Sequence, residues 1–159
     1  MALFKVVEQN GQKKVHAAQD IPAGAELCLF SGEIIDFNTT LTLGEYESFA
    51  MQIDMDRYIF LDPPARYFNH SCEPNCGVRP DFRLIALRNI MAEEELRWDY
   101  STTMMEKHWT MKCKCNASSC RETISDFDTL PKSLQEKYIS MNIVQDYIIR
   151  EIGRDIKEA

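Results

Sequence analysis

A short stretch from Ala65 to Cys76 carries most of the chain's candidate reactive groups. Its sequence, ARYFNHSCEPNC, places amide, imidazole, hydroxyl and thiol groups between aromatic residues and a Pro-Asn turn. A thiol beside an imidazole can serve nucleophilic catalysis, so a Cys/His hydrolase is one interpretation of His70 and Cys72. The two residues are only two positions apart, whereas such pairs usually come together from distant parts of a chain. The spacing therefore argues against a hydrolase.

The six cysteines of the chain form a second chemical signal. Three of them, Cys113, Cys115 and Cys120, lie within one short segment. Thiolates that converge in this way favour zinc, which takes four ligands in a closed structural site. Free thiols or a redox pair are the alternatives, whereas disulfides are disfavoured in a reducing compartment. The residues alone leave the fourth ligand open among His108, Cys72, Cys76 and Cys28.

Short strands and turns are the elements that must position these groups. Apolar and aromatic runs at 3–7, 25–30, 57–61 and 82–88 are each bounded by Gly, Pro, Asn or Asp, which is typical of strands. A short helix fits the range 41–51. The first two thirds of the chain are therefore predicted to be mostly β.

The last thirty residues have a helical pattern instead. Apolar residues recur there every three or four positions, at Met141, Val144, Ile148, Ile152 and Ile156. This spacing predicts one apolar face of a helix. We expect that face to pack against the core; a partner-binding or dimerising helix is the alternative, and the sequence leaves the oligomeric state open.

Length and composition predict a soluble protein with one main core. The chain has 159 residues, of which 45% are hydrophobic and 27% are charged, as in ordinary globular domains. No apolar run approaches the length of a membrane span, and the N-terminus has no secretory signal pattern. We therefore expect an intracellular protein, cytoplasmic or nuclear, without a membrane partner.

The negative charge of the chain is concentrated in one segment. Between Asp20 and Asp62 there are nine acids and one base, Arg57, a local net charge of −8, whereas the rest of the chain sums to +1. The absence of a basic stripe argues against direct nucleic-acid binding. Such a segment is commonly a solvated face, but it can also steer a basic peptide toward the protein.

The segment Arg66–Cys76 closely resembles the R-F-I-N-H-S-C-x-P-N-C motif of SET-domain protein lysine methyltransferases. Three further blocks resemble the same family in the same order along the chain. They are the D-I-P-x-G and G-E-x-I elements at 20–24 and 32–35, the E-E-L-x-F-D-Y segment at 94–100, and the post-SET motif C-x-C-x4-C-R at 113–121.

The resemblance implies a mostly β fold, the SET-domain β-clip of short sheets with a pseudoknot. A post-SET zinc loop and C-terminal helices follow it. The implied division is a SET domain at 1–108, a post-SET zinc-binding segment at 109–127 and a helical extension at 128–159. In the family, the cysteine of N-H-S-C joins the three post-SET cysteines on one Zn²⁺. The implied ligands are therefore Cys72, Cys113, Cys115 and Cys120, which leaves Cys28 and Cys76 as ordinary buried thiols.

The implied activity is S-adenosylmethionine-dependent methylation of a protein lysine, on a basic, histone-like protein or peptide. Tyr100 matches the tyrosine whose hydroxyl lies near the reacting methyl group, and we expect it to be the catalytic residue. The expected cofactor-binding residues are Lys13, Lys14, Arg66, Asn69, His70 and Tyr100. The expected walls of the substrate channel are Phe30, Phe68 and Trp98.

Three positions depart from the family pattern. Gln12-Lys13-Lys14 replaces the G-x-G of the cofactor loop, so either Gly11 serves instead or cofactor binding is weaker. Phe30 lacks the hydroxyl of a common tyrosine. Trp98 is bulkier than the usual phenylalanine or tyrosine, which favours transfer of fewer methyl groups. A catalytically weak, zinc-containing peptide-binding module is the alternative function.

Overall fold

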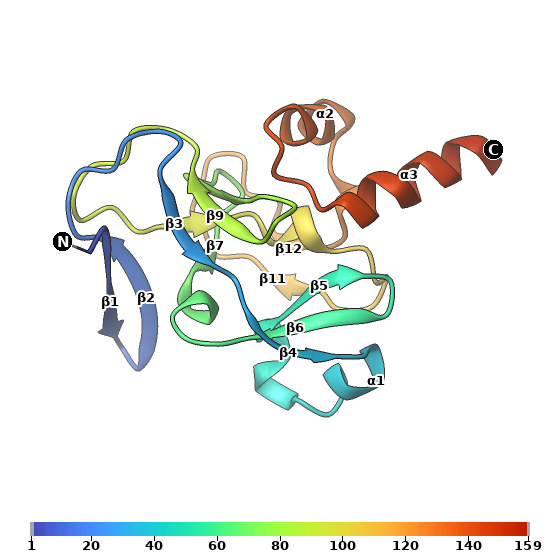
Figure 1. Cartoon of the computed structure of the whole chain (residues 1–159), viewed down its shortest axis with the longest axis horizontal. Coiled ribbons are helices and arrows are strands. Elements are labelled where there is room, and N and C mark those ends of the chain that lie inside the picture. Colours follow the sequence, from blue (N-terminus) through green and yellow to red (C-terminus); the bar gives the residue numbers. More distant parts are fainter. Residues whose placement is uncertain (1, 159) are drawn as a thin grey trace.

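The computed structural model describes residues 2–158, and the side-chain surroundings of residues 2–154. Short strands dominate the first two thirds, and the longer helices follow them (Figure 1). The strands are β1 Phe4–Gln9, β2 Gln12–Ala17, β3 Glu26–Leu29, β4 Gly32–Ile35, β5 Ala50–Asp54, β6 Arg57–Leu61, β7 Asn69–His70, β8 Cys76–Val78, β9 Arg83–Ala86, β10 Arg97–Trp98, β11 Met111–Lys112 and β12 Thr123–Ile124. The helices are α1 Phe37–Thr40, α2 Lys132–Ser140 and α3 Asp146–Glu158, with 3₁₀ helices η1 Gly44–Phe49, η2 Ala65–Tyr67, η3 Tyr100–Thr103 and η4 Phe127–Thr129.

The antiparallel hairpin β1–β2 lies at the end of the molecule opposite the C-terminal helices (Figure 1). Its turn residues Asn10 and Gly11 have φ angles of 54° and 75°. A two-residue hairpin turn with positive φ at both positions matches the right-handed twist of the strands, and Asn-Gly is its preferred sequence. The hairpin thus presents Gly11 at its tip.

Two three-stranded antiparallel sheets form the centre of the fold, in the orders β4-β6-β5 and β3-β9-β8. The strand predictions at 25–30, 57–61 and 82–88 are confirmed as β3, β6 and β9. Ile59 and Leu84 on these sheets are buried in one core cluster with Phe30 and Trp98. The range 41–51 contains a helix of the 3₁₀ type, η1, rather than an α-helix.

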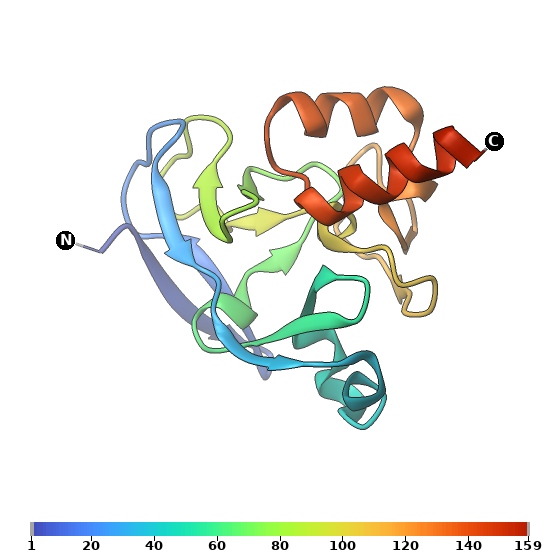
Figure 2. The same cartoon turned by 45° about the vertical axis from the view of Figure 1, so that its right-hand side comes forward.

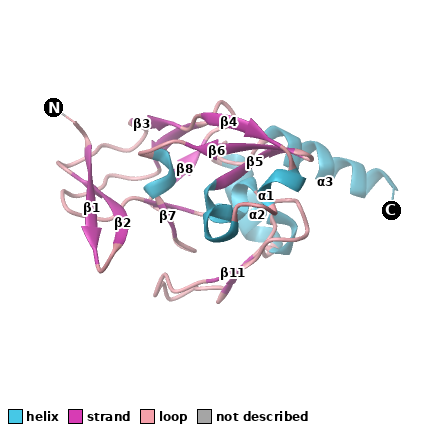
Figure 3. Cartoon of the chain, turned by 90° about the horizontal axis from the view of Figure 1, so that it is seen from below, coloured by secondary structure: helices cyan, strands magenta, loops and turns pink. Residues whose placement is uncertain are grey.

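Strands β7 and β10 pair in parallel, with Asn69 opposite Arg97 and Trp98 opposite His70. The pairing continues where Ser71 donates its backbone N–H to the Trp98 carbonyl at 3.1 Å. Two segments far apart in sequence therefore lie side by side, as the predicted pseudoknot requires. Seen from below, β7 lies between the β4–β6 sheet and the segment that contains β11 (Figure 3).

Helices α2 and α3 pack on a second core cluster at the other end of the molecule (Figure 2). This cluster includes Phe127 and Tyr138, and it confirms the expected burial of Val144 and Ile148, with Met141 and Ile152 packed at its edge. No described helix has the combination of length and apolar character that crossing a bilayer requires.

The prediction of one helical face from Met141 to Ile156 is wrong at its start, because only Ile148, Ile152 and Ile156 lie in one helix, α3. Helix α2 ends at Ser140 and α3 begins at Asp146. Between them Asn142 has a φ of 58°, a left-handed conformation that ends helices and that Asn tolerates well. Met141 and Val144 therefore lie in a turn, while the side chain of Ile156 lies outside the described surroundings.

Gly77 in β8 allows the turn between α2 and α3 to lie close to the sheet, because it has no Cβ. A Cβ at this position would lie 2.6 Å from Cγ2 of Ile143. We expect Gly77→Ala to lower the free energy of unfolding by about 1–3 kcal/mol, because the added methyl group overpacks this contact. Urea denaturation measures the change. In a double-mutant cycle with Ile143→Ala the two costs should be less than additive, and strict additivity would contradict this explanation.

Candidate active site and metal centre

Four cysteine thiols meet in one cluster, formed by Cys72, Cys113, Cys115 and Cys120. Their sulfur atoms all lie within 4.8 Å of one another, and the Cys72 and Cys113 sulfurs are 3.7 Å apart. Residues from the loop after β7 and from the post-SET segment are thus brought together. Four convergent thiolates are a donor set that suits tetrahedral Zn²⁺, so these residues fit the implied metal.

The other metal-ligand candidates lie outside this cluster. His108 is exposed, and its ring packs edge-on against Phe37 at 5.5 Å. Cys76 is fully buried in the first core cluster. Cys28 is only partly buried, so it does not match the expectation of a buried thiol. Of the four candidates for the fourth position, Cys72 is the one that lies with Cys113, Cys115 and Cys120.

The thiols of the cluster differ in how readily they ionise, because burial raises the pKa of Cys72 and of Cys113 whereas the pKa of Cys115 is lowered. Burial opposes ionisation of the Cys115 thiol, but hydrogen bonds from the backbone at Cys72 and Ala117 and from neighbouring thiols lower its pKa to about 6. The backbone N–H of Arg121 points at the Cys72 sulfur from 3.4 Å. Because only the thiolate binds a metal ion, Cys115 is the readiest of these three thiols to bind one, and metal binding would release the protons of the other two.

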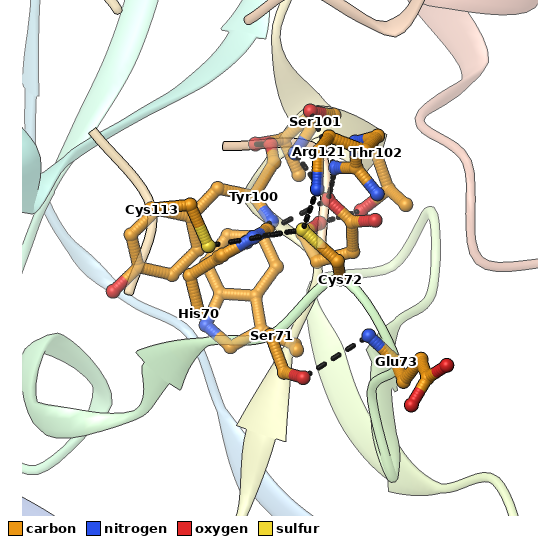
Figure 4. A network of polar contacts seen from close by, with 12 residues as sticks. His70, Ser71, Cys72, Glu73, Tyr100, Ser101, Thr102, Cys113 and Arg121 are labelled. Carbon is orange, nitrogen blue, oxygen red and sulfur yellow. Dashed lines mark hydrogen bonds and ion pairs between the residues drawn. The ribbon is translucent and has the colours of Figure 1, made fainter. Parts of the chain in front are cut away.

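His70 connects the cysteine cluster to Tyr100 (Figure 4). The backbone N–H of Tyr100 donates to Nδ1 of His70 at 3.1 Å, so the ring proton is assigned to Nε2, which lies 3.4 Å from the Cys72 sulfur. Burial lowers the pKa of His70 to about 4, although Asp99 nearby opposes this shift. At neutral pH the ring is therefore uncharged and can donate a hydrogen bond to a metal-bound thiolate.

Asp99 is the centre of a buried polar network beside this histidine. Its Oδ1 accepts from Arg121 Nη2 at 2.8 Å and from the Ser101 backbone N–H at 3.0 Å. Its Oδ2 accepts from the Tyr138 hydroxyl at 3.0 Å. Sequence reasoning missed these roles. Asp99 and Arg121 stood inside the matched motifs, which could have pointed to them, whereas nothing in the pattern singled out Tyr138.

Two hollows have Tyr100 in their lining, and we name them the first and the second hollow. The second hollow, of about 1980 Å³ including its open mouth, is lined by every residue that was expected to bind the cofactor. These residues are Lys13, Lys14, Arg66, Asn69, His70 and Tyr100. Gly11 at the hairpin tip also lines it, together with the post-SET residues 111–115. One face of the second hollow therefore comes from the segment that carries three of the four clustered cysteines.

Basic side chains in the second hollow are held in place by their neighbours. Arg66 donates from Nε to the Leu61 carbonyl at 2.7 Å, and its guanidinium lies 4.9 Å from the rings of Phe49 and Phe60. The Lys14 ammonium is 3.9 Å from Glu95. These cations could receive the carboxylate of an amino-acid group, which suits the methionine end of S-adenosylmethionine.

The first hollow, of about 490 Å³ including its open mouth, shares Tyr100 with the second hollow and is rich in aromatic rings. Trp98 lines it, whereas Phe30 and Phe68 line neither hollow and pack in the core behind Trp98. The Phe30 and Trp98 ring centroids are 5.6 Å apart. The indole N–H donates to the Phe68 carbonyl at 3.2 Å, which fixes the orientation of the bulky ring.

Tyr100 lines both hollows. Its hydroxyl also donates to the Phe68 carbonyl, at 3.1 Å. Burial, with a smaller contribution from Glu95, raises the pKa of this hydroxyl, so it stays protonated at neutral pH. Tyr100 therefore belongs to both hollows and carries one oriented, neutral hydroxyl.

Comparisons with known proteins agree with this geometry. A probable histone-lysine N-methyltransferase of Caenorhabditis elegans, set-23, is 30% identical over 149 residues, which cover 77% of this chain and 59% of that protein. The histone-lysine N-methyltransferase trr of Drosophila melanogaster is 32% identical over 124 residues, which cover 68% of this chain and 5% of that protein. This chain thus spans about three fifths of the first relative and a small part of the second.

Solved structures match over a similar range. The methyltransferase domain of human SETMAR superposes with a TM-score of 0.60 at 23% identity, over 77% of this chain and 58% of that one, which supports the fold alone. KRYPTONITE in complex with DNA, an H3(1-15) peptide and SAH superposes with a TM-score of 0.57 at 26% identity, over 76% of this chain and 29% of that one. The family model described as SET domain matches residues 12–101, more than half of the sequence. By that match, the chain belongs to the SET-domain family.

Proposed function

We propose that this chain is a protein lysine N-methyltransferase that uses S-adenosylmethionine and acts on a basic, histone-like protein or peptide. The observation that carries the proposal is Tyr100, whose side chain lines both a hollow with fixed cations and a hollow with aromatic walls. Two relatives are named histone-lysine N-methyltransferases. KRYPTONITE, which shares the fold, was solved with an H3 peptide and SAH.

The reaction moves a methyl group from the cofactor sulfonium to a lysine nitrogen. The N–C bond forms as the S–C bond breaks, and S-adenosylhomocysteine leaves. A lysine with its ordinary pKa of about 10.4 is protonated at pH 7, so it must lose a proton to solvent before it can attack. Desolvation favours the neutral amine. The rings of Trp98 and Tyr100, whose centroids are 4.7 Å apart, would supply that environment in the first hollow.

The chain's own residues would align the two reactants. Bound S-adenosylmethionine supplies the methyl group. Arg66 and Lys14 would hold the amino-acid end of the cofactor, and the Tyr100 hydroxyl, oriented by the Phe68 carbonyl, would set the approach of the amine. Such positioning contributes a large share of the rate when both reactants are held in line. The fixed Trp98 ring narrows the first hollow, and we keep the prediction that few methyl groups fit.

The proposed division of the chain is a SET domain at 1–108, a post-SET zinc-binding segment at 109–127 and a helical extension at 128–159. Cys72, Cys113, Cys115 and Cys120 would hold one Zn²⁺, and the ion would fix the post-SET segment against the second hollow.

Replacing Tyr100 by phenylalanine tests the catalytic assignment. We expect Tyr100→Phe to reduce methyl transfer by about tenfold or more, because the oriented hydroxyl is lost while the ring remains. Cofactor affinity should change little, because the hydroxyl bonds to the Phe68 carbonyl and, among the described residues, makes no hydrogen bond to Arg66 or Lys14, the basic groups proposed to hold the cofactor. Labelled methyl transfer to histones, with calorimetric titration of S-adenosylmethionine, measures both quantities. Ser133→Ala, which removes an exposed hydroxyl that lines neither hollow, is the control, and an unchanged rate in Tyr100→Phe would move the catalytic role elsewhere.

The second candidate, a catalytically weak SET-like module, rests on Phe30. This side chain is fully buried against the Trp98 and Phe68 rings, so no hydroxyl is available from its position. Measurements of S-adenosylmethionine binding and of methyl transfer, both on zinc-loaded protein, distinguish the two functions. Absence of S-adenosylmethionine binding would refute the enzyme, while binding without methyl transfer to any histone or lysate protein would favour the weak module.

A further inference from the structure

Two carboxylates share the first hollow with the aromatic rings. Glu47 comes from η1 and Glu106 follows η3, so they approach the hollow from different parts of the chain. Tyr58 and Trp109 also line it. A hollow that combines aromatic faces with carboxylates is suited to a cationic side chain.

Glu106 is already committed to bonds within the protein. Its Oε2 accepts from the Tyr58 hydroxyl at 2.5 Å, and its Oε1 accepts from the Trp109 backbone N–H at 3.2 Å. Burial and the bond to Glu106 raise the pKa of Tyr58, so the phenol remains a donor. Glu106 therefore stabilises the wall of the hollow.

Glu47 is in a different state. Its Oε1 is shielded from solvent and accepts no hydrogen bond from the described part of the chain. A desolvated carboxylate oxygen without a donor is costly, and most buried polar groups in folded proteins are satisfied. A donor brought by a ligand would remove this cost. A positively charged group that enters the first hollow could donate this missing hydrogen bond to Glu47.

The target lysine is a poor choice for that cation. A carboxylate next to its nitrogen would favour the protonated form, whereas methyl transfer needs the neutral amine. A guanidinium, which stays charged at any physiological pH, carries no such conflict and can bond to a carboxylate through two N–H groups. A second basic side chain of the substrate therefore fits Glu47 better than the reacting one.

On the proposed function, we infer that Glu47 selects substrates in which a basic residue, best an arginine, lies beside the target lysine. Two other acids of the 20–62 segment are already paired with bases. Glu26 pairs with Arg79 at 2.9 Å and with Arg83 at 3.1 Å, and Asp54 pairs with Arg150 at 2.7 Å. Part of the local charge of −8 is thus offset by bases outside the segment, while Glu47 stays available in the hollow.

A peptide library with one fixed lysine and randomised flanking positions tests the inference. Zinc-loaded protein is incubated with the library and labelled S-adenosylmethionine, and methylated peptides are identified by mass spectrometry. We expect arginine to be enriched about tenfold at one flanking position, the effect of one charge-assisted hydrogen bond. Glu47→Gln should reduce that enrichment to about twofold or less. The charge reversal Glu47→Lys should shift the preference at the same position to Asp or Glu.

Glu33→Gln is the matched control, because Glu33 is an exposed acid of the same segment that lines neither hollow. It should keep the arginine preference. Thermal unfolding shows whether each variant is folded. Methylation by the wild-type protein without a basic preference, or a preference that persists in folded Glu47→Gln, would overturn the inference alone. Methylation of no library peptide and no histone would instead refute the proposed function, and the inference with it.

Discussion

Replacing Asp99 by alanine is expected to lower the free energy of unfolding by about 3–5 kcal/mol, the typical cost of removing one partner of a buried ion pair. The Asp99 side chain is 0% exposed and that of Arg121 is 17% exposed. Without the carboxylate, the Arg121 guanidinium and the Tyr138 hydroxyl both lose their short bonds. Urea denaturation of the zinc-loaded protein measures the difference.

The control for this variant breaks an ion pair of similar length on the surface. Arg150 and Asp54 lie 2.7 Å apart with side chains that are 48% and 42% exposed. Arg150→Ala should cost less than about 1 kcal/mol, because solvent screens exposed pairs. Asp99→Asn keeps the shape but removes the charge, so it should fall between the two. Equal losses in Asp99→Ala and Arg150→Ala would show that the Asp99 network contributes no special stability.

Replacing Cys115, one of the four proposed metal ligands, is expected to have the second large effect. Cys115→Ser should lower the zinc content from about one ion per chain to a small fraction, because a structural site needs its four ligands. Loss of the ion should weaken S-adenosylmethionine binding by about tenfold or more, since residues 111–115 line the second hollow and metal binding supplies folding energy to such segments. Metal analysis and calorimetry measure the two quantities.

Cys28→Ser provides the matched control for the metal prediction. Cys28 is a partly buried thiol in β3 and lies outside the four-cysteine cluster. This variant should keep both its zinc and its cofactor affinity. Full zinc content in Cys115→Ser would contradict the four-cysteine site, whereas zinc loss with unchanged cofactor affinity would separate the metal from the second hollow.

Local patterns predicted β1, β3, β6 and β9, because Gly, Pro, Asn or Asp mark the ends of these apolar runs, whereas the other strands were not predicted. The pseudoknot and the fourth cysteine came from a family resemblance, since spacing alone left several ligands open. The break between α2 and α3 was missed because apolar spacing continues through the turn at Asn142. Spacing shows which side chains are buried, but it does not show that the backbone reverses between them.

The site could be predicted only where its residues belong to continuous motifs. Asn69 and His70 are neighbours in one motif, and the second hollow contains both. Glu47 and Glu106 are 59 positions apart in the sequence, and only the tertiary fold brings them to one hollow. The same holds for Asp99 and Tyr138, whose contact depends on how α2 packs.

The bond between Asp99 and Tyr138 has a consequence for the order in which the protein is made. The two residues are 39 positions apart, so the ribosome completes the Asn69–Cys76 loop, Tyr100 and all four cysteines before it reaches Tyr138. Until then Oδ2 of Asp99 has no tyrosine to bond. Translation of α2 therefore supplies the hydrogen bond that holds Oδ2 of Asp99, the residue next to Tyr100.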